Sequence, residues 1–387
     1  MTKSAPVVVL AGMIASDPCQ GGATWAVLQY LLGLRRLGCE VIFVEPIKAA
    51  ALEPANAPLP RSRNAAYFQQ VVTQFGLDDK ATLLLEGTRS TVGLSYEQLR
   101  AALRRADVLL NISGMLEDDE LLAAIPVRTF LDLDPAFVQL WHAAEGIDMG
   151  FADHTHFVTI GLAIGGPECE VPTCGLDWIT TPQPIVLERW PLAGRIEYDA
   201  LTTVANFRGY GSIEHGGTFF GQKAHSLRDI VDLPRHVSEK ILLALSIHPE
   251  EKRDLDSLRV HGWHLIDPAK VADGPASYQR FIQGSKAELG LAKSGYIASR
   301  CGWFSDRSLC YLASGRPVVA QNTAFDDFFP TGKGLFSFHT VEEAAECVRS
   351  INLDYDLHRS SARAIAEAHF DSDLVLPRLL HNLGISW

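Results

Sequence analysis

The sequence predicts an α/β protein made of two Rossmann-like domains that face a central cleft. Three observations lead to this fold class. A strand–helix–strand pattern opens the chain, a second alternation of apolar runs and amphipathic stretches begins near residue 200, and a glycine-containing loop leads from a strand into a helix within residues 293–327. A chain of 387 residues is long enough for two domains. Its hydrophobic content of 47% provides for a core in each of them.

The first unit of the chain is the clearest. Val7–Ala11 is a continuous apolar run, which is typical of a strand buried on both faces. After a loop of small residues over 12–22, apolar residues recur with helical spacing along Thr24–Leu37, and Gly38 supplies a C-cap. Val41–Val44 is the next strand. Strand, helix and parallel strand in this order predict the βαβ unit of a doubly wound sheet.

The rest of the first domain, expected to span residues 1–195, alternates in the same way with weaker patterns. Helices are expected at Tyr67–Phe75 and Tyr96–Arg105, and strands at Asp107–Ile112, Arg128–Leu133 and Phe157–Ile160. Proline-rich Pro182–Pro191 is typical of an extended connector. The segment ending near residue 200 is therefore the expected linker between the domains.

A second domain is expected over residues 196–370. Its predicted strands are Leu201–Asn206, a stretch within Leu258–Ile266, Leu289–Ala292, Pro317–Ala320 and Gly334–Phe338. Its predicted helices are Ser226–Val231, Ser238–Leu245, Val341–Ile351 and Asp354–His369. A last amphipathic helix, Ser372–Leu383, lies within residues 371–387, and we expect this segment to pack back on the first domain.

Charge and the first residues bound the function. The chain has 46 acidic and 34 basic residues and a net charge of −12, which argues against nucleic acid as a partner because that needs a basic face. The apolar run Val7–Ala11 is too short for a signal peptide or a membrane span. We therefore expect a cytoplasmic protein without a transmembrane segment. The seven cysteines are expected to be free thiols.

Two groups of residues suggest a metal ion. Cys169 and Cys174 follow His154 and His156, but their spacing fits no standard zinc pattern. Asp132 and Asp134 would share one face of a strand and could hold Mg²⁺ or Mn²⁺. Strand-end acids that face solvent or cap the next element explain this second pair more simply. No metal site is predicted.

Cations gather around the loop and helix start within residues 293–327. Lys293, Arg300 and Arg307 lie there in an otherwise acidic chain. Backbone N–H groups at a helix start favour anions, because the first four have no partner inside the helix and the positive end of the dipole lies there. The pattern favours a phosphate or diphosphate ligand. The alternative is a solvated loop with ordinary surface arginines.

Four segments resemble a known class of enzyme. Arg300–Ser305, which reads Arg-Cys-Gly-Trp-Phe-Ser, resembles the His-Cys-Gly-Trp-Asn-Ser phosphate loop of GT-B glycosyltransferases, and Ser305–Gly315 is similar to the bacterial members. Gly315–Val319 resembles their Gly-x-Pro strand start. Gly21-Gly22 before a helix resembles the opening of their acceptor domain. The resemblance implies two Rossmann-like domains and a nucleotide-activated sugar as donor, with no need for a metal.

The resemblance also implies roles for single positions. Lys223, Lys293, Arg300 and Arg307 would contact the donor diphosphate, together with the loop residues Gly302, Trp303, Phe304 and Ser305. Trp263 would face the nucleotide base, Asp326 and Asp327 the donor sugar, and Gly21 and Gly22 the acceptor side. Lys223 and Arg307 could equally be a loop lysine and a solvent-facing arginine, and Asp326 an N-cap.

The chain departs from the pattern at the ribose. GT-B enzymes commonly have a glutamate that contacts the ribose on the helix after the phosphate loop, and Cys310 stands at that position here. Asp306, one turn earlier, is the candidate substitute. The paired glutamates of many retaining members are absent too, since Gly302 fills the earlier position.

A catalytic base is needed if the acceptor hydroxyl attacks the sugar directly. Asp17 lies in the first strand–helix loop, where open α/β sheets bind ligands, although an Asp before Pro18 also suits a turn. His154 has an ordinary pKa of about 6.5, which suits a base, although a surface histidine is the simpler explanation. Both candidates stay open.

The predicted function is transfer of a hexose from a uridine or thymidine diphosphate sugar to an unidentified hydroxyl-bearing acceptor, without a further cofactor and without a metal. Two alternatives remain: a sugar-nucleotide epimerase or hydrolase on the same architecture, and a non-catalytic binding protein. Cys310 in place of the ribose-binding acid keeps the last alternative open.

Overall fold

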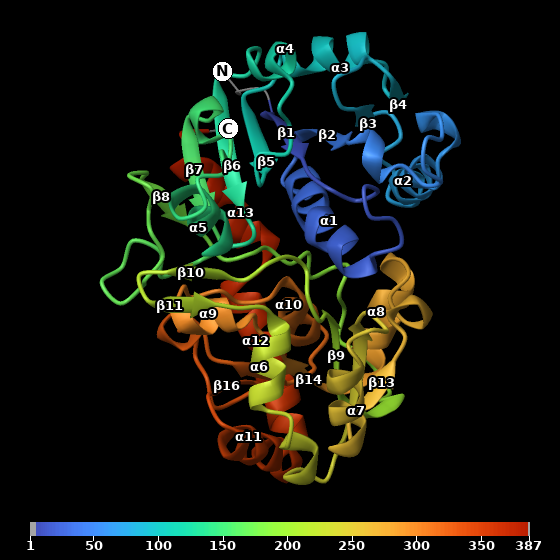
Figure 1. Ribbon diagram of the computed structural model, residues 1–387. Coiled ribbons are helices and arrows are strands. Elements are labelled where there is room, and N and C mark those ends of the chain that lie inside the picture. Colours follow the sequence, from blue (N-terminus) through green and yellow to red (C-terminus); the bar gives the residue numbers. More distant parts are fainter. Residues whose placement is uncertain (1–4, 386–387) are drawn as a thin grey trace.

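The computed structural model describes residues 5–385 and contains two α/β domains, one above the other in Figure 1. Residues 1–4 and 386–387, at the ends of the predicted first and last segments, lie outside the described residues. Each domain has a largely parallel sheet that is covered by helices, so the predicted pair of Rossmann-like domains is confirmed.

The first domain is built on an eight-stranded sheet of order β4-β3-β2-β1-β5-β6-β7-β8. All neighbouring strands are parallel except β3 and β4. The strands are β1 (Val7–Ala11), β2 (Glu40–Ile47), β3 (Ala81–Leu85), β4 (Thr91–Gly93), β5 (Val108–Ile112), β6 (Val127–Asp132), β7 (His156–Thr159) and β8 (Trp178–Thr180). The helices are α1 (Gly21–Arg36), α2 (Arg63–Gln74), α3 (Tyr96–Leu103), α4 (Asp119–Leu122) and α5 (Phe137–Ala143).

The second domain has a six-stranded sheet of order β13-β12-β9-β14-β15-β16, parallel throughout. Its strands are β9 (Tyr198–Asn206), β12 (Lys240–Ser246), β13 (His264–Ile266), β14 (Ser285–Gly290), β15 (Val318–Gln321) and β16 (Leu335–Phe338). Its helices are α6 (Lys223–Asp229), α7 (Lys252–Val260), α8 (Pro275–Gly284), α9 (Ser294–Ser299), α10 (Asp306–Ala313), α11 (Val341–Leu353) and α12 (Tyr355–His369). An antiparallel hairpin of β10 (Ile213–His215) and β11 (Thr218–Phe220) follows β9.

One predicted element is wrong. Residues 238–245 were expected to be a helix, but 240–246 form β12, the strand between β9 and β13. Ile241, Leu243 and Ala244 are fully buried, because the strand lies inside the sheet with packed faces on both sides. A short apolar run of this kind has no period that separates a buried strand from a buried helix.

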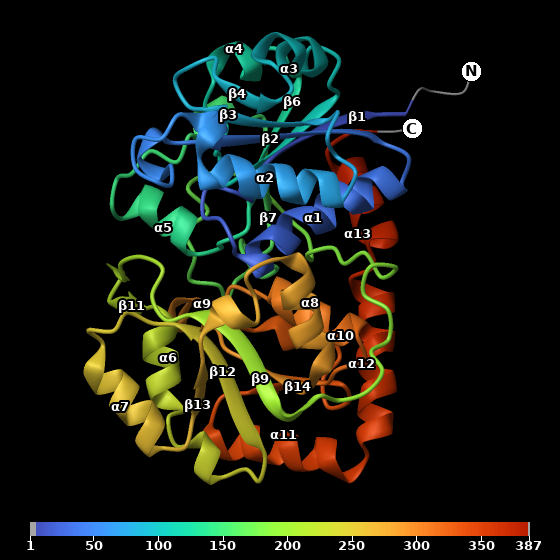
Figure 2. The ribbon, with the colours of Figure 1, turned by 90° about the vertical axis from the view of Figure 1, so that its right-hand side faces the viewer.

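The chain crosses back to the first domain at its end. Helix α12 ends at His369, and α13 (Ser372–Asn382) follows after a short break and lies beside α1, as Figure 2 shows. The two helices come very close at Gly33, where an added Cβ would lie 2.5 Å from a methyl group of Leu376. The break is held by Ile185, whose N–H donates to the carbonyl of Phe370 at 2.7 Å.

Apolar packing continues from one domain into the other. Trp25 of α1, Trp190 of the connector and Tyr278 of α8 belong to one buried cluster. Phe137 of α5 and Tyr296 of α9 belong to a second cluster that also spans both domains. All seven cysteines are free thiols. In residues 5–385, no helix is long and apolar enough to cross a membrane.

Candidate active site

A cavity of about 670 Å³ lies where the carboxyl ends of the two sheets face each other. In both sheets the strand order reverses around the first strand, β1 in one domain and β9 in the other. Open α/β sheets bind ligands at such switch points. Residues of both domains line the cavity, among them Met13, Asp17, Cys19, Gln20, Glu53 and Arg63 of the first and Asn206, Lys223, Ser246, Asp267, Tyr278, Lys293, Asp306 and Arg307 of the second.

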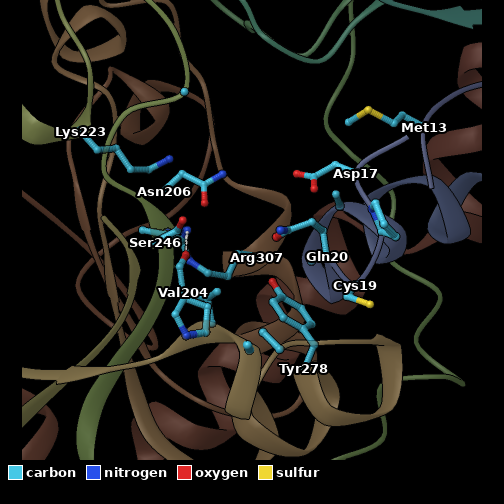
Figure 3. A pocket seen from close by; sticks show the side chains of 18 of the residues that line it. Met13, Asp17, Cys19, Gln20, Val204, Asn206, Lys223, Ser246, Tyr278 and Arg307 are labelled. Carbon is cyan, nitrogen blue, oxygen red and sulfur yellow. Dashed lines mark hydrogen bonds between the residues drawn. The ribbon is translucent and has the colours of Figure 1, made fainter. Parts of the chain in front are cut away.

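Lys223 is the cation that remains free for a ligand. It begins α6, and among the described residues no carboxylate pairs with its ammonium group. Burial, together with the neighbouring charges of Arg307 and Lys293, lowers its pKa to about 7. Figure 3 shows its side chain pointing into the cavity from one wall, while the Asp17 carboxylate points inward from the opposite wall.

The other two cations that the second domain contributes to the cavity are neutralised by carboxylates. Lys293 donates to both oxygens of Asp134 at 2.8 and 2.9 Å, and Tyr210 and Tyr296 also donate to this carboxylate. The Arg307 Nε donates to the fully buried Glu288 at 2.6 Å, and its Nη1 donates to the carbonyl of Val204 at 2.9 Å. The positive charges of Lys293 and Arg307 are therefore largely neutralised by carboxylates of the protein itself.

The start of α10 contributes an acid to the same wall. Ser305 caps this helix by accepting from the N–H of Arg307 at 3.2 Å, and Asp306 follows at the edge of the cavity. Burial raises the pKa of Asp306, and no cation forms an ion pair with it among the described residues. Cys310 lies one turn further into the protein, where it is almost fully buried. Asp306 is therefore in reach of a ligand, and Cys310 is not.

The opposite wall belongs to the loop between β1 and α1. Asp17 stands at the exposed edge of this loop, and partial burial together with the nearby Glu53 raises its pKa. Arg63 donates to Glu53 at 3.0 Å and to the Cys19 sulfur at 3.2 Å. Of these side chains, Asp17 is the one whose carboxylate points into the cavity without a cation bound to it.

The predicted phosphate loop lies outside the cavity. Arg300 is half exposed and pairs with Glu168 at 3.1 Å and Asp327 at 3.8 Å on the surface. Gly302 packs against the first domain, where an added Cβ would lie 2.8 Å from the backbone nitrogen of Ala163. Its own N–H donates to the carbonyl of Thr323 at 2.7 Å. Gly302 therefore lies at the domain interface, and its N–H does not face the cavity.

The neighbours of that loop are also held inside the protein. Trp303 stacks near Tyr296, Phe304 packs against Phe325 and Phe370, and Ser305 caps α10. Asp326 accepts from Asn322 at 2.5 Å and from Ser337 at 3.0 Å. Asp326 and Asp327 therefore order a turn and the surface beside it, and neither lines the cavity.

His154 and Trp263 have structural positions. Nε2 of His154 lies 3.0 Å from the Asn111 amide and Nδ1 lies 2.7 Å from the carbonyl of Gly150, so both ring nitrogens are occupied. Burial lowers the pKa of His154. Trp263 is buried in the core of the second domain and donates to the carbonyl of Val231 at 2.8 Å. The structure leaves Asp17 as the base candidate that faces the cavity.

The glycines before α1 divide between two positions. Gly22 lines the cavity, whereas Gly21 lies against α8, with its N–H donating to the carbonyl of Ala272 at 2.9 Å. The possible metal ligands are apart: in residues 5–385 no cluster of three His, Cys, Asp or Glu side chains could hold a metal ion. Asp132 is buried and accepts from Gln139 and Thr159, and Asp134 accepts from Lys293.

Sequence patterns alone missed several residues of the cavity. Asn206 and Ser246 end β9 and β12, and Asp267 follows β13. The signal was available for Asn206 and Asp267, since both are polar residues at the end of a predicted strand. It was absent for Ser246, because the strand before it was predicted as a helix.

Comparison with known proteins places the fold. No protein-family model matches the chain, and no curated protein sequence matches it significantly. Solved structures do match over nearly the whole length. AviGT4, a glycosyltransferase involved in avilamycin A biosynthesis, has 15% identity and a TM-score of 0.55, with 98% of this chain and 97% of that chain covered.

Two further solved structures also match the chain over nearly its whole length. An alpha-glucosyltransferase in complex with UDP and a 13-mer DNA has 11% identity and a TM-score of 0.61, and Anabaena Alr3699/HepE in complex with UDP and glucose has 10% identity and a TM-score of 0.58. Each comparison covers 98% of this chain and 99% of the other. The chain therefore has the GT-B glycosyltransferase fold, and the predicted resemblance is confirmed at that level.

Proposed function

We propose that this protein is a glycosyltransferase that moves a hexose from a nucleoside-diphosphate sugar to a hydroxyl group of a small acceptor. The observation that carries the proposal is the pairing of a free cation, Lys223, with an inward-pointing carboxylate, Asp17, on opposite walls of a cavity between two Rossmann-like domains. The GT-B fold supports it, since structural neighbours were solved with UDP or with UDP and glucose. The nucleotide would be uridine or thymidine diphosphate.

Each proposed role follows from the chemistry of transfer. Negative charge develops on the departing diphosphate, and the positive charge of Lys223 would stabilise it. Asp306 would accept hydrogen bonds from the ribose hydroxyls, which Cys310 cannot reach. As the bond between the sugar and the diphosphate breaks, the acceptor oxygen bonds to the sugar carbon and its proton passes to Asp17. The nucleoside diphosphate is the second product.

The net charge of the chain bears on the kind of acceptor. The alpha-glucosyltransferase neighbour was solved with DNA. A net charge of −12 argues against a polyanionic acceptor for this chain, because phosphate backbones bind to basic surfaces. We therefore propose a small hydroxylated molecule, and DNA serves as the comparison acceptor in a transfer assay.

The proposal is tested by binding and transfer with a matched pair of lysine variants. Calorimetric titration with uridine and thymidine diphosphate sugars should show binding to the wild type. Lys223→Met should weaken the affinity by about 10- to 100-fold, because a charge-assisted phosphate contact contributes about 1.5–3 kcal/mol. Lys240→Met, at the exposed start of β12, is the control and should leave it unchanged.

Three outcomes would separate the alternatives. Failure of both sugar nucleotides to bind the wild type would refute the proposal. Binding with release of free sugar, or with a changed sugar nucleotide, would indicate a hydrolase or an epimerase. Binding without turnover in the presence of an acceptor panel would indicate the non-catalytic binding protein.

A further inference from the structure

The loop that carries Asp17 is held by a buried carboxylate that lies outside the cavity. Residues 12–20 form no helix or strand, and three successive N–H groups of this loop point to one side chain. Ile14, Ala15 and Ser16 donate to the carboxylate of Glu45 at 3.0, 2.7 and 2.6 Å, and the hydroxyl of Ser16 donates to it at 3.0 Å.

Glu45 is an unusual residue for its place in the fold. It belongs to β2, in the middle of the first sheet, and is 0% exposed. Burial of a carboxylate is costly unless hydrogen bonds compensate it. In the described part of the chain no lysine or arginine pairs with Glu45, so the loop amides and Ser16 are the donors that offset this cost.

The charge has no other structural use. An apolar side chain at this position would fill the core without a desolvation cost, as Val44 and Ile47 do in the same strand. Burial raises the Glu45 pKa to about 7 although every hydrogen bond of the loop lowers it. The carboxylate therefore reduces core stability and makes contacts that order the loop.

Asn64 holds the same loop from a second side. This residue of α2 is fully buried and donates to the carbonyl of Ala15 at 2.8 Å and to that of Ala51 at 3.2 Å. Its amide oxygen accepts from the N–H of Glu53 at 2.8 Å. Buried polar side chains thus fix two segments of the cavity wall, the one with Asp17 and the one with Glu53.

We propose that Glu45 is a positioning residue, which holds the backbone of residues 14–16 through its carboxylate and thereby directs Asp17 into the cavity. The geometric part of this inference is independent of the reaction. Its catalytic consequence rests on the proposed function: with Asp17 displaced, chemistry should slow while the donor, bound by the second domain, keeps its affinity.

The test uses Glu45→Gln, which keeps the shape of the side chain. It replaces one carboxylate oxygen, which accepts hydrogen bonds from the loop N–H groups, with an NH₂ group that can only donate. Glu40→Gln is the matched control, because Glu40 begins the same strand and pairs with Lys80 and Arg105 on the surface. Hydrogen–deuterium exchange of a peptide over residues 12–20 should be at least about tenfold faster in Glu45→Gln and unchanged in the control. Unchanged exchange in both variants would overturn the proposal.

Kinetics then separate positioning from simple destabilisation. In Glu45→Gln we expect kcat to fall by about 10- to 100-fold, the effect of a small misplacement of a reacting group, with donor affinity within about twofold of the wild type. Glu45→Asp, which retains the charge, should recover part of this loss. Equal losses of kcat and donor affinity that follow the loss of folded protein would instead show a purely structural role and overturn the proposal.

A second variant and the donor binding of the wild type complete the test. If Glu45→Gln does not fold, Ser16→Ala removes one of the four donors and should speed exchange of the same peptide by a smaller factor, and no change there would overturn the inference. If the wild type binds no sugar nucleotide, the proposed function fails, while faster exchange in Glu45→Gln still supports the positioning of the loop.

Discussion

At the residue scale, Lys223 differs from the other two cations that the second domain contributes to the cavity. Lys293 and Arg307 each bond to a carboxylate of the protein, whereas Lys223 has no such partner among the described residues. An unpaired, half-buried ammonium group loses its proton easily, which is why burial brings its pKa to about 7. An incoming anion would restore the charge.

This coupling predicts a pH dependence of donor binding. Lys223 is mostly charged at pH 6 and mostly neutral at pH 8.5, and a bound diphosphate favours the charged form. Because binding at high pH requires Lys223 to take up a proton, the affinity for a sugar nucleotide should fall by about tenfold as the pH rises from 6.5 to 8.5. Calorimetry at several pH values measures this directly.

A sugar nucleotide is the suitable probe because a terminal phosphate itself titrates at a pKa of about 6. Lys223→Met serves as the control and should bind weakly with little change over the same pH range. An equally steep pH dependence in that variant would assign the proton to another group.

Arg300 is predicted to have little effect on binding, contrary to what the sequence pattern indicated. Its guanidinium pairs with Glu168 and Asp327 at the surface, away from the cavity. Arg300→Ala should change sugar-nucleotide affinity by less than about twofold and stability by less than about 1 kcal/mol, as for an exposed ion pair. A titration that shows a tenfold loss would return Arg300 to the binding site.

At the element scale, the start of α1 is packed against α8 of the other domain. The Trp25 indole N–H donates to the carbonyl of Pro275 at 2.9 Å, and the ring of Tyr278 lies against Gly22. Gly21 is closest of all, since an added Cβ would lie 2.3 Å from the carbonyl oxygen of Gly274. Glycine is required here because backbone meets backbone.

Gly21→Ala should therefore push α8 away from α1. We expect a loss of about 1–3 kcal/mol in the free energy of unfolding, the usual cost of overpacking, measured by urea denaturation. Gly194→Ala, where an added Cβ meets no atom within 4 Å, is the control and should stay within about 0.5 kcal/mol. Equal stability of the two variants would contradict the packing at this contact.

The elements also show which patterns a sequence resolves. The period of α1 and the glycine after it predicted the helix and its end, and Gly38 indeed has a positive φ of 86°. The apolar run that became β12 carried no period, so its type depended on the neighbouring strands β9 and β13. The predicted phosphate loop does not line the cavity, and the motif could not show this, because a motif does not state which side of a loop faces the cavity.

At the scale of the whole molecule, one carboxylate joins the two domains. Asp134 follows β6 of the first domain and accepts from Lys293, Tyr210 and Tyr296 of the second. Phe137 packs beside this group against Tyr210 and Tyr296, so polar and apolar contacts across the domains adjoin each other. Lys293 and Tyr210 also line the cavity, so these contacts join the domains beside it.

Asp134→Asn should weaken the contact between the two domains. The variant leaves Lys293 largely buried without its counter-charge, and we expect the free energy of unfolding to fall by about 1–3 kcal/mol. Denaturant titration measures it, with Asp256→Asn, an exposed partner of Arg259, as the control. Adding Lys293→Met to Asp134→Asn should recover part of the loss, and a double variant less stable than Asp134→Asn would count against the pairing.

The sequence by itself determined the α/β class, the two alternating halves, the first βαβ unit and the chemical kind of several residues that line the cavity. These properties follow from local periodicity, strand-end positions and the GT-B resemblance. Lys223, Asp17 and Asp306 could be proposed because Lys223 and Asp306 begin helices and Asp17 lies in the loop between β1 and α1, where parallel sheets present their ligand-binding edge.

Only the tertiary structure decided which of the candidate side chains face the cavity. His154, Trp263, Arg300 and Asp326 have suitable chemistry, but packing and hydrogen bonds place them in the cores, in a turn or on the outer surface. Glu45 and Asn64 were invisible to motif analysis, because their partners are backbone groups of a loop about 30 and 50 residues away along the chain. Such contacts form only when segments that are distant in sequence pack together, so a local sequence pattern cannot predict them.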